Sequence, residues 1–305
     1  MIEVVVPLLT IYIFIVIGFL LKAFFKDELH DKTVTLISVY ALQPFLTFWG
    51  LYDREIDGSL FLSPLYYLGI VFMMLIVSIF IAKKLFLDKK TRSIVTVAAL
   101  IGNTGNLGLP VGLALFGEQS IPYITIINLA NIFFVFTFGV YYYSRGEFSV
   151  KKSLLNIVKL PVLWIAIIAL FSNKINLTLS EHFVNMLQMG AYAGIVIQLI
   201  IFGIYTKSIK IKSFDLKLNS TVIIVKFGLL PTLAYFILLS APFEPYVKGI
   251  ILMELIMPLA VMNVNLAALY NCKVNEVTSI LLYSTIVFIP IIVVLNYILN
   301  ILGWK

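Results

Sequence analysis

Asparagine side chains gather at two breaks in the apolar sequence. Asn103 and Asn106 belong to the segment Gly102–Pro110, which also contains three glycines, and Asn263 and Asn265 follow a proline. A side-chain amide donates hydrogen bonds to an anion without holding it as tightly as an arginine does, so such a site can release what it captures. Alternatively, these side chains join membrane helices to one another. The residue types therefore predict a reversible binding site for a small anion.

Further uncharged polar side chains lie close to the breaks or in helices expected beside them. Thr104 lies inside the first break, Gln43 precedes Pro44, and Gln198 lies in the corresponding helix of the second half. Each of them could face a substrate or pack between helices. The predicted substrate-binding residues are Asn103, Thr104, Asn106, Pro110, Pro258, Asn263 and Gln43.

Glu254 lies one helical turn before Pro258, inside an apolar stretch. An ionised residue at the centre of a membrane helix costs about 2.5–3.5 kcal/mol on insertion scales, so this carboxyl must be protonated, paired or bound to a cation. We expect Glu254 and Asn265 to hold a coupling ion, either H⁺ or Na⁺. A structural hydrogen bond and exposure to an outer vestibule are the alternatives for Glu254. The long side chain of Lys226 is expected to snorkel to the membrane interface.

The chain around these residues is too apolar for a soluble domain. It has 305 residues, of which 61% are hydrophobic and 12% are charged, and its mean hydropathy is +1.06. The first apolar run has no cleavage site after it and is expected to be a retained helix. Runs long enough to cross a hydrocarbon core of about 30 Å predict an all-α integral membrane protein with ten transmembrane helices, near residues 5–21, 33–51, 60–82, 93–116, 121–143, 157–172, 183–203, 220–240, 246–270 and 276–302.

Basic residues are distributed unevenly between the predicted loops. Seventeen of the 22 lysine and arginine residues fall in the odd-numbered loops and three in the even-numbered ones. Because basic loops stay in the cytoplasm, we expect a multi-pass protein of the cell membrane with both termini outside. Attraction of these loops to anionic lipid accounts for the net charge of +7, so no nucleic-acid partner is predicted.

Landmarks in the two halves of the chain keep their order and nearly their spacing. They predict two five-helix repeats, residues 1–143 and 157–305, joined by a cytoplasmic linker at 144–156. Because five is odd, the second repeat is inverted, and the broken helices 4 and 9 are expected to cross near the midplane with their half-helix N-termini at a shared cavity. The landmark pairs, each roughly 150 residues apart, are Pro7 and Pro161, Pro44 and Gly194, Pro110 and Pro258, and Glu118 and Glu276.

Other classes of function find little support in the sequence. The single cysteine, Cys272, cannot form an intrachain disulfide, and no spacing of cysteine and histidine resembles a metal site. The glycines of the first break do not form a dinucleotide fingerprint, and no hydrolase motif occurs. The chain is therefore not expected to be an enzyme or to bind a metal. A channel stays an alternative, because a crossover of broken helices could line a continuous pore.

The first break, Gly102-Asn103-Thr104-Gly105-Asn106-Leu107-Gly108-Leu109-Pro110, resembles the fourth-helix signature of the auxin efflux carrier family. Four other stretches are similar to that family's first, second, sixth and ninth helices, so the resemblance covers nearly the whole chain. They are Pro7 to Lys22, Gln43-Pro44-Phe45-Leu46, Lys159-Leu160-Pro161-Val162 and Met257-Pro258-Leu259-Ala260-Val261. Gly194 departs from the family, in which many members have proline at this position of the seventh helix.

This resemblance implies a fold like that of bile-acid symporters and sodium/proton antiporters. Helices 1, 2, 6 and 7 would form a scaffold, helices 3–5 and 8–10 a transport domain, and the protein would be a homodimer. Small organic anions, including auxin-like weak acids, would bind at Asn103 and Asn106 and cross by an elevator-type motion. The partner asparagine in helix 9 would be Asn263 or Asn265. Coupling to protons, facilitated transport and sodium-coupled symport are the alternatives that the resemblance leaves open.

Overall fold

The computed structural model describes the whole chain except residues 1, 55, 145–154, 156 and 209–213. The described residues are helical almost throughout and contain no β-strand apart from one isolated bridge. Helices are the expected result for so apolar a chain, because they satisfy every backbone N–H and C=O internally in the absence of water. Most of the predicted linker at 144–156 falls outside the described residues, as do Arg145, Lys151, Lys152, Lys210 and Lys212.

In the first half of the chain, the helical segments follow the predicted apolar runs. Short π-helical turns (η2, η4 and η6) interrupt three of the stretches. The segments are α1 (Ile2–Phe25), η1 (Lys26–Glu28), α2 (Asp31–Ile37), η2 (Ser38–Leu42), α3 (Gln43–Leu51), α4 (Gly58–Leu85), α5 (Lys89–Val97), η3 (Ala98–Leu100), η4 (Thr104–Gly108), α6 (Leu109–Phe116), η5 (Glu118–Ser120), α7 (Ile121–Phe134), η6 (Val135–Gly139) and α8 (Val140–Tyr143).

In the second half, one π-helical turn (η7) interrupts the stretch that begins at Leu216. The segments are α10 (Pro161–Lys174), α11 (Glu181–Ser208), α12 (Leu216–Ile224), η7 (Val225–Leu229), α13 (Leu230–Leu239), α14 (Pro245–Ile256), α15 (Met262–Leu269) and α16 (Val274–Leu302).

Six of these stretches are long and apolar enough to cross a membrane: Asp31–Leu51, Gly58–Leu85, Glu118–Tyr143, Glu181–Lys207, Leu216–Leu239 and Val274–Leu302. That is fewer than the ten spans predicted. A membrane helix needs about 20 residues; the breaks leave α5, α6, α14 and α15 each well below that length, and α10 has only 14 residues. The count covers only those residues whose side chains are described, which leaves out much of α1. The chain is nevertheless a membrane-spanning protein, because several complete apolar helices run through it.

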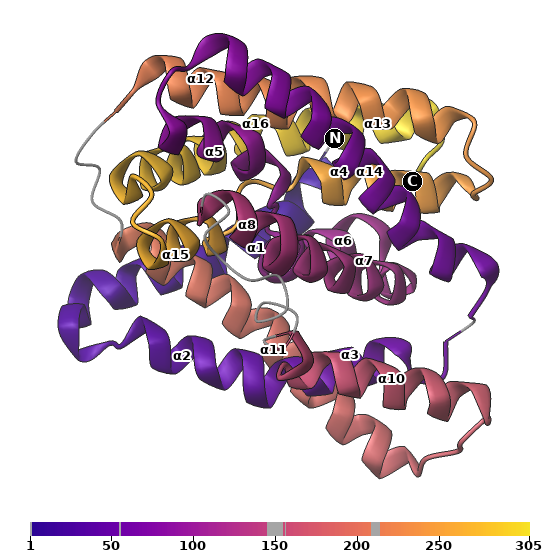
Figure 1. The fold of residues 1–305 in the computed structure, drawn as a ribbon. Helices are drawn as coiled ribbons and strands as arrows, with labels where there is room; N and C mark the ends of the chain where they lie inside the picture. Colours follow the sequence, from indigo (N-terminus) through magenta and orange to yellow (C-terminus); the bar gives the residue numbers. More distant parts are fainter. Residues whose placement is uncertain (1, 55, 145–154, 156, 209–213) are drawn as a thin grey trace.

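The helices pack in two groups. In one group, α11 packs against α1 and α3, and α3 packs against α10; Figure 1 shows α2, α3, α10 and α11 together in the lower part of the view. Glycines bring α1 and α11 very close, since a Cβ on Gly18 would lie 2.9 Å from the Cα of Ile200. In the other group, α4 packs against α5 and α7, α13 against α14, and α15 against α16. The groups meet where η4, α6 and α7 touch α1, α3 and α11.

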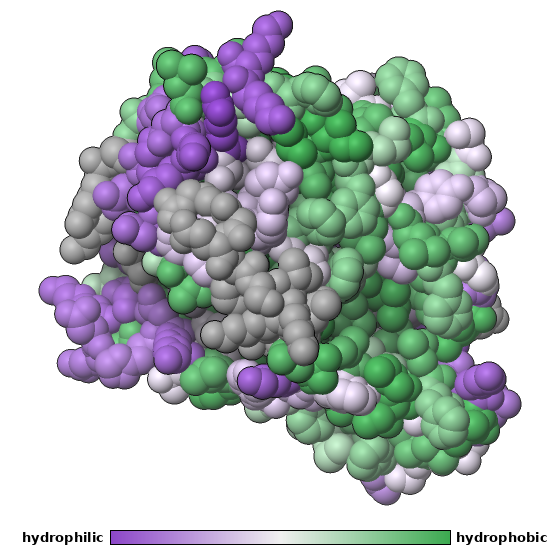
Figure 2. Space-filling model, viewed as in Figure 1, coloured by the Kyte–Doolittle hydropathy of each residue, from purple (hydrophilic) through white to green (hydrophobic). Residues whose placement is uncertain are grey.

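The surface fits a membrane protein. Figure 2 shows hydrophobic side chains across most of one face, with hydrophilic ones gathered toward the side where α5 and α12 lie. On that side, Lys273 Nζ lies 2.9 Å from Asp88 Oδ2 and 2.7 Å from Thr91 Oγ1. This ion pair joins the α4–α5 loop to the α15–α16 loop, two basic loops that the charge distribution assigns to the same side of the membrane.

Candidate functional site: a crossover and its cavity

The two breaks meet, as the sequence predicts, and their backbones run antiparallel to each other. The N–H of Asn103 donates a hydrogen bond of 2.8 Å to the carbonyl of Pro258, and the N–H of Ala260 donates one of 3.0 Å to the carbonyl of Ile101. The N–H of Leu259 donates to Ser284 Oγ at 3.2 Å. Unwound backbone inside a membrane must find partners for its freed polar groups. Here each break supplies partners for the other.

The unwound part of the first break is shorter than the sequence suggests. Only residues 101–103 are non-helical, whereas Thr104–Gly108 forms the π-helical turn η4 and α6 starts at Leu109. Pro110 is the second residue of α6 and follows η4 directly; because proline has no N–H, it leaves the preceding turn without one regular hydrogen bond, but the helical backbone continues through it. The second break is confined to residues 257–261.

Side chains from neighbouring helices brace the crossover. Asn263 Nδ2 donates to the carbonyl of Ile101 at 3.0 Å and to that of Ala260 at 3.1 Å, and its Oδ1 accepts from the hydroxyl of Tyr143 at 2.9 Å. Asn131 Nδ2 donates to the carbonyl of Gly102 at 3.0 Å. Asn263, which was predicted to bind substrate, is fully buried and committed to these bonds. Its hydrogen-bonding capacity holds the two breaks together.

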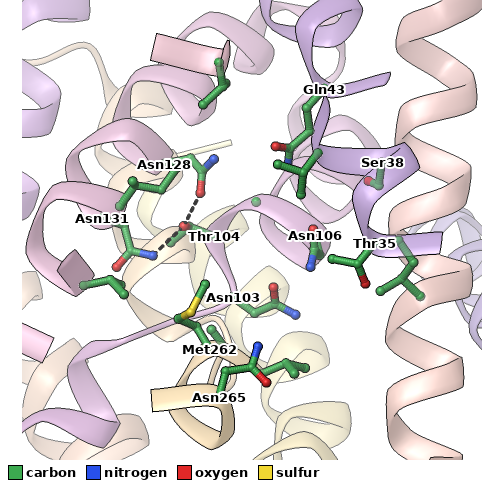
Figure 3. Close-up of a pocket in the computed structure, with 18 of the residues that line it drawn as sticks. Thr35, Ser38, Gln43, Asn103, Thr104, Asn106, Asn128, Asn131, Met262 and Asn265 are labelled. Carbon is green, nitrogen blue, oxygen red and sulfur yellow. Dashed lines mark hydrogen bonds between the residues drawn. The ribbon is translucent and has the colours of Figure 1, made fainter. Parts of the chain in front are cut away.

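A cavity of about 210 Å³ opens beside the crossover. Figure 3 shows Asn103, Asn106 and Asn265 gathered around one space, together with Gln43 and Thr35. The walls combine uncharged polar and apolar residues, and none of the lining residues is charged. The lining residues are Thr35, Ser38, Val39, Gln43, Gly102, Asn103, Thr104, Gly105, Asn106, Asn128, Asn131, Ile132, Val135, Phe136, Leu160, Val162, Ile201, Tyr205, Ala260, Val261, Met262 and Asn265.

The structure brings five predicted residues together at this cavity and places four others elsewhere. Gln43, Asn103, Thr104, Asn106 and Asn265 line it. The other four are Pro110, Pro258, Asn263 and Glu254, all buried outside the cavity. Of the two residues expected to hold a coupling ion, Asn265 lines the cavity and Glu254 does not. Pro258 contributes its backbone carbonyl to the crossover.

Two lining residues that the sequence analysis missed come from α7. Thr104 Oγ1 donates to Asn128 Oδ1 at 2.8 Å and accepts from Asn131 Nδ2 at 2.9 Å, as the dashed lines in Figure 3 show. Asn128 and Asn131 are three positions apart and so share one face of their helix. That spacing within an apolar helix was the available signal. Thr35, Ser38 and Tyr205 were missed as well, and the Thr35 and Tyr205 hydroxyls lie 3.2 Å apart.

One buried side-chain atom at the cavity has no hydrogen-bond partner in the described part of the chain. Asn103 is only 5% exposed, and its amide nitrogen Nδ2 makes no hydrogen bond. The N–H groups of Thr104, Gly105 and Asn106, in the first turn of η4, also line this space and have no carbonyl of the preceding turn to donate to, whereas the first N–H groups of α15 donate to the carbonyls of Ala260 and Val261. The N-terminus of a helical segment carries partial positive charge. The cavity therefore offers hydrogen-bond donors and a positive potential without a formal cation.

Three π-helical turns contribute to the cavity walls. η2 supplies Ser38 and Val39, η4 supplies Thr104 to Asn106, and η6 supplies Val135 and Phe136. A π-helical turn disturbs the regular backbone ladder of a helix and is frequent at functional sites. Their concentration around one space marks it as a site. Within the described residues, no group of three histidine, cysteine, aspartate or glutamate side chains could hold a metal ion.

A lysine and a glutamate side chain lie buried close to the crossover but outside the cavity. Lys226, in η7, is 1% exposed, and Glu254, in α14, is 0% exposed. Lys226 therefore does not snorkel to the interface as the sequence predicts. Its Nζ points inward, 3.1 Å from the position of a Cβ built on Gly102. Gln198 is also fully buried and does not line the cavity.

Comparisons with known proteins agree with the membrane-spanning fold. A family model described as a membrane transport protein matches residues 3–296. A protein of Methanocaldococcus jannaschii described as an uncharacterized transporter is 25% identical over 304 residues, which cover 95% of this chain and 97% of the relative. The similarity therefore extends over both breaks and the whole set of helices around them.

Proposed function

Since the chain belongs to the membrane transport protein family, the auxin efflux carrier family of its sequence motifs, we propose that it carries small organic anions across the membrane. Transport, as opposed to catalysis, is the activity shared by the family and the archaeal relative. That the substrate is an anion is inferred from the chemistry of the cavity.

The unpartnered amide nitrogen of Asn103 carries this proposal. A buried donor without a hydrogen bond costs roughly 1–3 kcal/mol, and a carboxylate in the cavity would remove that cost. Asn106 and Asn265 offer further amides, and the helix N-terminus at Thr104 favours negative charge. Because no arginine or lysine lines the cavity, the anion would be bound weakly enough to leave.

The size and walls of the cavity favour a small acid with an apolar body. Its volume of about 210 Å³ is below the roughly 300–1,000 Å³ of sites for drug-sized ligands. Val135, Phe136, Val162 and Met262 provide apolar surface beside the asparagines. A monocarboxylate could place its charged end at Asn103 and its hydrocarbon part against these side chains.

The helix packing supports an elevator-type mechanism. We propose ten membrane helices in a 5+5 inverted repeat, residues 1–143 and 157–305, in which the two broken stretches are the fourth helix of each half. The group around α1, α3, α10 and α11 would be the scaffold, and the group that holds the crossover would move. The cavity lies between them, since Gln43 and Ile201 come from the first group and Asn103 and Asn265 from the second.

The position of the cavity suggests the state and orientation of the carrier. Thr35, Leu160 and Tyr205 lie at helix ends that adjoin the basic loops. If these loops are cytoplasmic, the cavity faces inward and both termini lie outside the cell membrane. A homodimer through the scaffold helices is proposed from the family resemblance alone.

Uptake by proteoliposomes tests the carrier proposal. Vesicles containing the protein should take up labelled monocarboxylates or dicarboxylates in a saturable manner and show counterflow, which a channel would not show. Asn103→Ala should raise the half-saturating concentration about 10- to 100-fold, as expected for the loss of one hydrogen bond to a charged group.

Asn185→Ala is the matched control, since Asn185 is an exposed asparagine in α11 and should transport normally. Saturable uptake with unchanged affinity in Asn103→Ala would remove the proposed site, and a linear, unsaturable flux would favour a channel.

A further inference from the structure

Lys226 and Glu254 lie behind the crossover, on elements that both belong to the group proposed to move. Neither residue lines the cavity, and both are almost completely buried. A buried charge in a membrane protein is costly, so such residues are usually paired or mark a functional site. Lys226 does not contact the cavity, although its ammonium group is among the most buried cations in the described part of the chain.

Two glycines of the first break give the charged groups access to the crossover. The position of a Cβ on Gly102 lies 3.1 Å from Lys226 Nζ, and that of a Cβ on Gly108 lies 2.8 Å from the carboxyl carbon of Glu254. A larger side chain at Gly102 would press on the ammonium group of Lys226, and one at Gly108 would press on the carboxyl group of Glu254. The two glycines therefore let one cation and one carboxyl group lie directly against the backbone of the first break, of which Gly102 lines the cavity.

The carboxyl group of Glu254 is not committed to any structural hydrogen bond. Both of its oxygens are buried and unpartnered among the described residues. Lys226 acts on it electrostatically, but no direct ion-pair contact joins the two where the structure describes the chain. A carboxylate held by several donors would be locked in its ionised form. This one is free to gain or lose a proton.

Hydrogen-bonded polar groups near this carboxyl group lead to the cavity, although no hydrogen bond joins them to the carboxyl group itself. Glu254 interacts electrostatically with the buried hydroxyl of Tyr67, which donates to Asn131 Oδ1 at 3.3 Å. Asn131 in turn donates to Thr104 Oγ1 and to the carbonyl of Gly102, and all three residues line the cavity. The charge at Glu254 therefore acts through space on a buried hydroxyl that is hydrogen-bonded to the groups that would hold an anion.

The surroundings favour a proton over a metal ion at this position. α14 packs against α4, α6, α7, α13 and η4, and the titratable groups that act on Glu254 are the ammonium of Lys226 and the hydroxyl of Tyr67. A sodium ion would be repelled by the ammonium charge. A proton needs no ligand shell and forms an O–H bond with one carboxyl oxygen.

We propose that Lys226 and Glu254 form a proton-exchange site that makes the carrier an electroneutral symporter of one proton with one monovalent anion. This proposal rests on the carrier function proposed above. In the empty carrier, the ammonium and the carboxylate cancel. When a proton binds Glu254, an O–H bond forms and one positive charge is left at Lys226, which the bound carboxylate of the substrate balances.

Both forms that must cross the membrane are then free of net charge at the crossover. The empty form holds Lys226⁺ and Glu254⁻, and the loaded form holds Lys226⁺, neutral Glu254 and the substrate anion. Binding of the proton alone, or of the anion alone, leaves a net buried charge, which is costly to move through a low-dielectric region. Coupling follows from this difference. On release, the proton returns to water and Glu254 becomes ionised again.

Glu254→Gln provides the sharpest test, because glutamine mimics the protonated side chain. In proteoliposomes with labelled isobutyrate and labelled malonate as probes, and with leak subtracted from protein-free vesicles, the wild type should show counterflow and uptake driven by a pH gradient. Imposing a membrane potential with potassium and valinomycin should change the uptake of isobutyrate less than twofold. Glu254→Gln should keep counterflow within about threefold of the wild type but lose pH-driven net uptake at least tenfold, since its empty form carries a net charge.

Lys226→Met separates the roles of the two side chains. It removes the positive charge that balances the substrate, so counterflow and net uptake should both fall at least tenfold, and Glu254→Gln added to it should not restore them. Because counterflow by Glu254→Gln reports a folded carrier, loss of counterflow in that variant overturns the proposal, and so does unchanged pH-driven uptake. Uptake driven by a sodium gradient at equal pH on both sides also overturns it while leaving the carrier function intact. Absence of counterflow by the wild type with every carboxylate would instead contradict the carrier function itself.

Discussion

Asn263 and Asn265 lie two positions apart on α15 and project to different environments. Asn263 is fully buried and bonded to the carbonyl of Ile101 and the hydroxyl of Tyr143, whereas Asn265 is exposed and lines the cavity. Residues two apart on a helix do not share a face. The first therefore holds the crossover together, and the second is available to a substrate.

Exchange of these two asparagines for alanine should separate stability from transport. Asn263→Ala leaves buried hydrogen-bonding groups without partners and should lower the free energy of unfolding by about 1–3 kcal/mol. The thermal unfolding midpoint in detergent measures this loss. Asn265→Ala should leave the midpoint unchanged and weaken uptake. The reverse pattern would assign the substrate contact to Asn263 and contradict the geometry described above.

The sequence predicts the breaks well but does not distinguish these neighbours. Glycine, asparagine and proline clustered at membrane depth locate the two breaks, although the unwound backbone is confined to residues 101–103 and 257–261 and does not extend through Gly102–Pro110. Whether Asn263 or Asn265 faces the cavity depends on where α15 starts, and Met262 begins it because the preceding residues pair with the other break. That pairing is a tertiary contact between residues about 150 positions apart.

Lys226 illustrates a second limit of the sequence. Two turns from a helix end, a lysine in a membrane helix commonly extends to the interface. The structure buries it instead, because Gly102 leaves space at the crossover and Glu254 supplies an opposite charge. Both residues are distant in the chain. Asn128 and Asn131 were overlooked for a related reason, since single polar residues in an apolar helix are equally consistent with helix packing.

Gly108 should tolerate no side chain. A Cβ there would lie 2.8 Å from the carboxyl carbon of Glu254, so Gly108→Ala must push the carboxyl group or η4 out of place. Overpacking of this kind costs typically about 1–3 kcal/mol. We expect a lower unfolding midpoint and loss of transport. Gly69→Ala in α4 is the matched control, because nothing lies within 4 Å of its added methyl group. Equal effects of the two substitutions would show that helix propensity, and not the contact with Glu254, decides the outcome.

The ion pair at the basic loops should make stability depend on pH in the acid range. Hydrogen bonds from Lys273 and Thr91 lower the pKa of Asp88 below its ordinary value of 3.8. A lowered pKa means that this stabilisation is complete above the ordinary value and is lost as the pH falls toward the lowered one. The difference in unfolding midpoint between the wild type and Asp88→Asn should therefore be full at pH 7 and should shrink below about pH 4.

Asparagine suits this comparison because it can still cap α5, as Asp88 does by accepting a 2.9 Å hydrogen bond from the N–H of Thr91. The substitution thus removes the charge and keeps the cap. Since the Asp88 side chain is half exposed, the effect should also decrease at high salt. A difference that grows as the pH falls would contradict the assignment of the lowered pKa to this pair.

On the side away from the basic loops, contacts of Glu118 should hold the two helix groups in one relative position. Its carboxylate accepts hydrogen bonds from Arg54 at 3.3 Å and from the hydroxyl of Tyr192 at 2.7 Å, which ties the start of α7 to the α3–α4 loop and to α11. If the groups move relative to each other, this contact stabilises the state in which the cavity opens toward the basic loops.

Glu118→Ala should then increase labelling of a cysteine at position 106 by an impermeant thiol reagent from the outer side. Loss of about 1 kcal/mol corresponds to a roughly fivefold higher population of the opposite state. The assay uses a Cys272→Ser background, which removes the single native thiol. Tyr192→Phe, which removes one of the two bonds, should give a smaller increase, and equal labelling of all three proteins would show that the cluster has no influence on the motion.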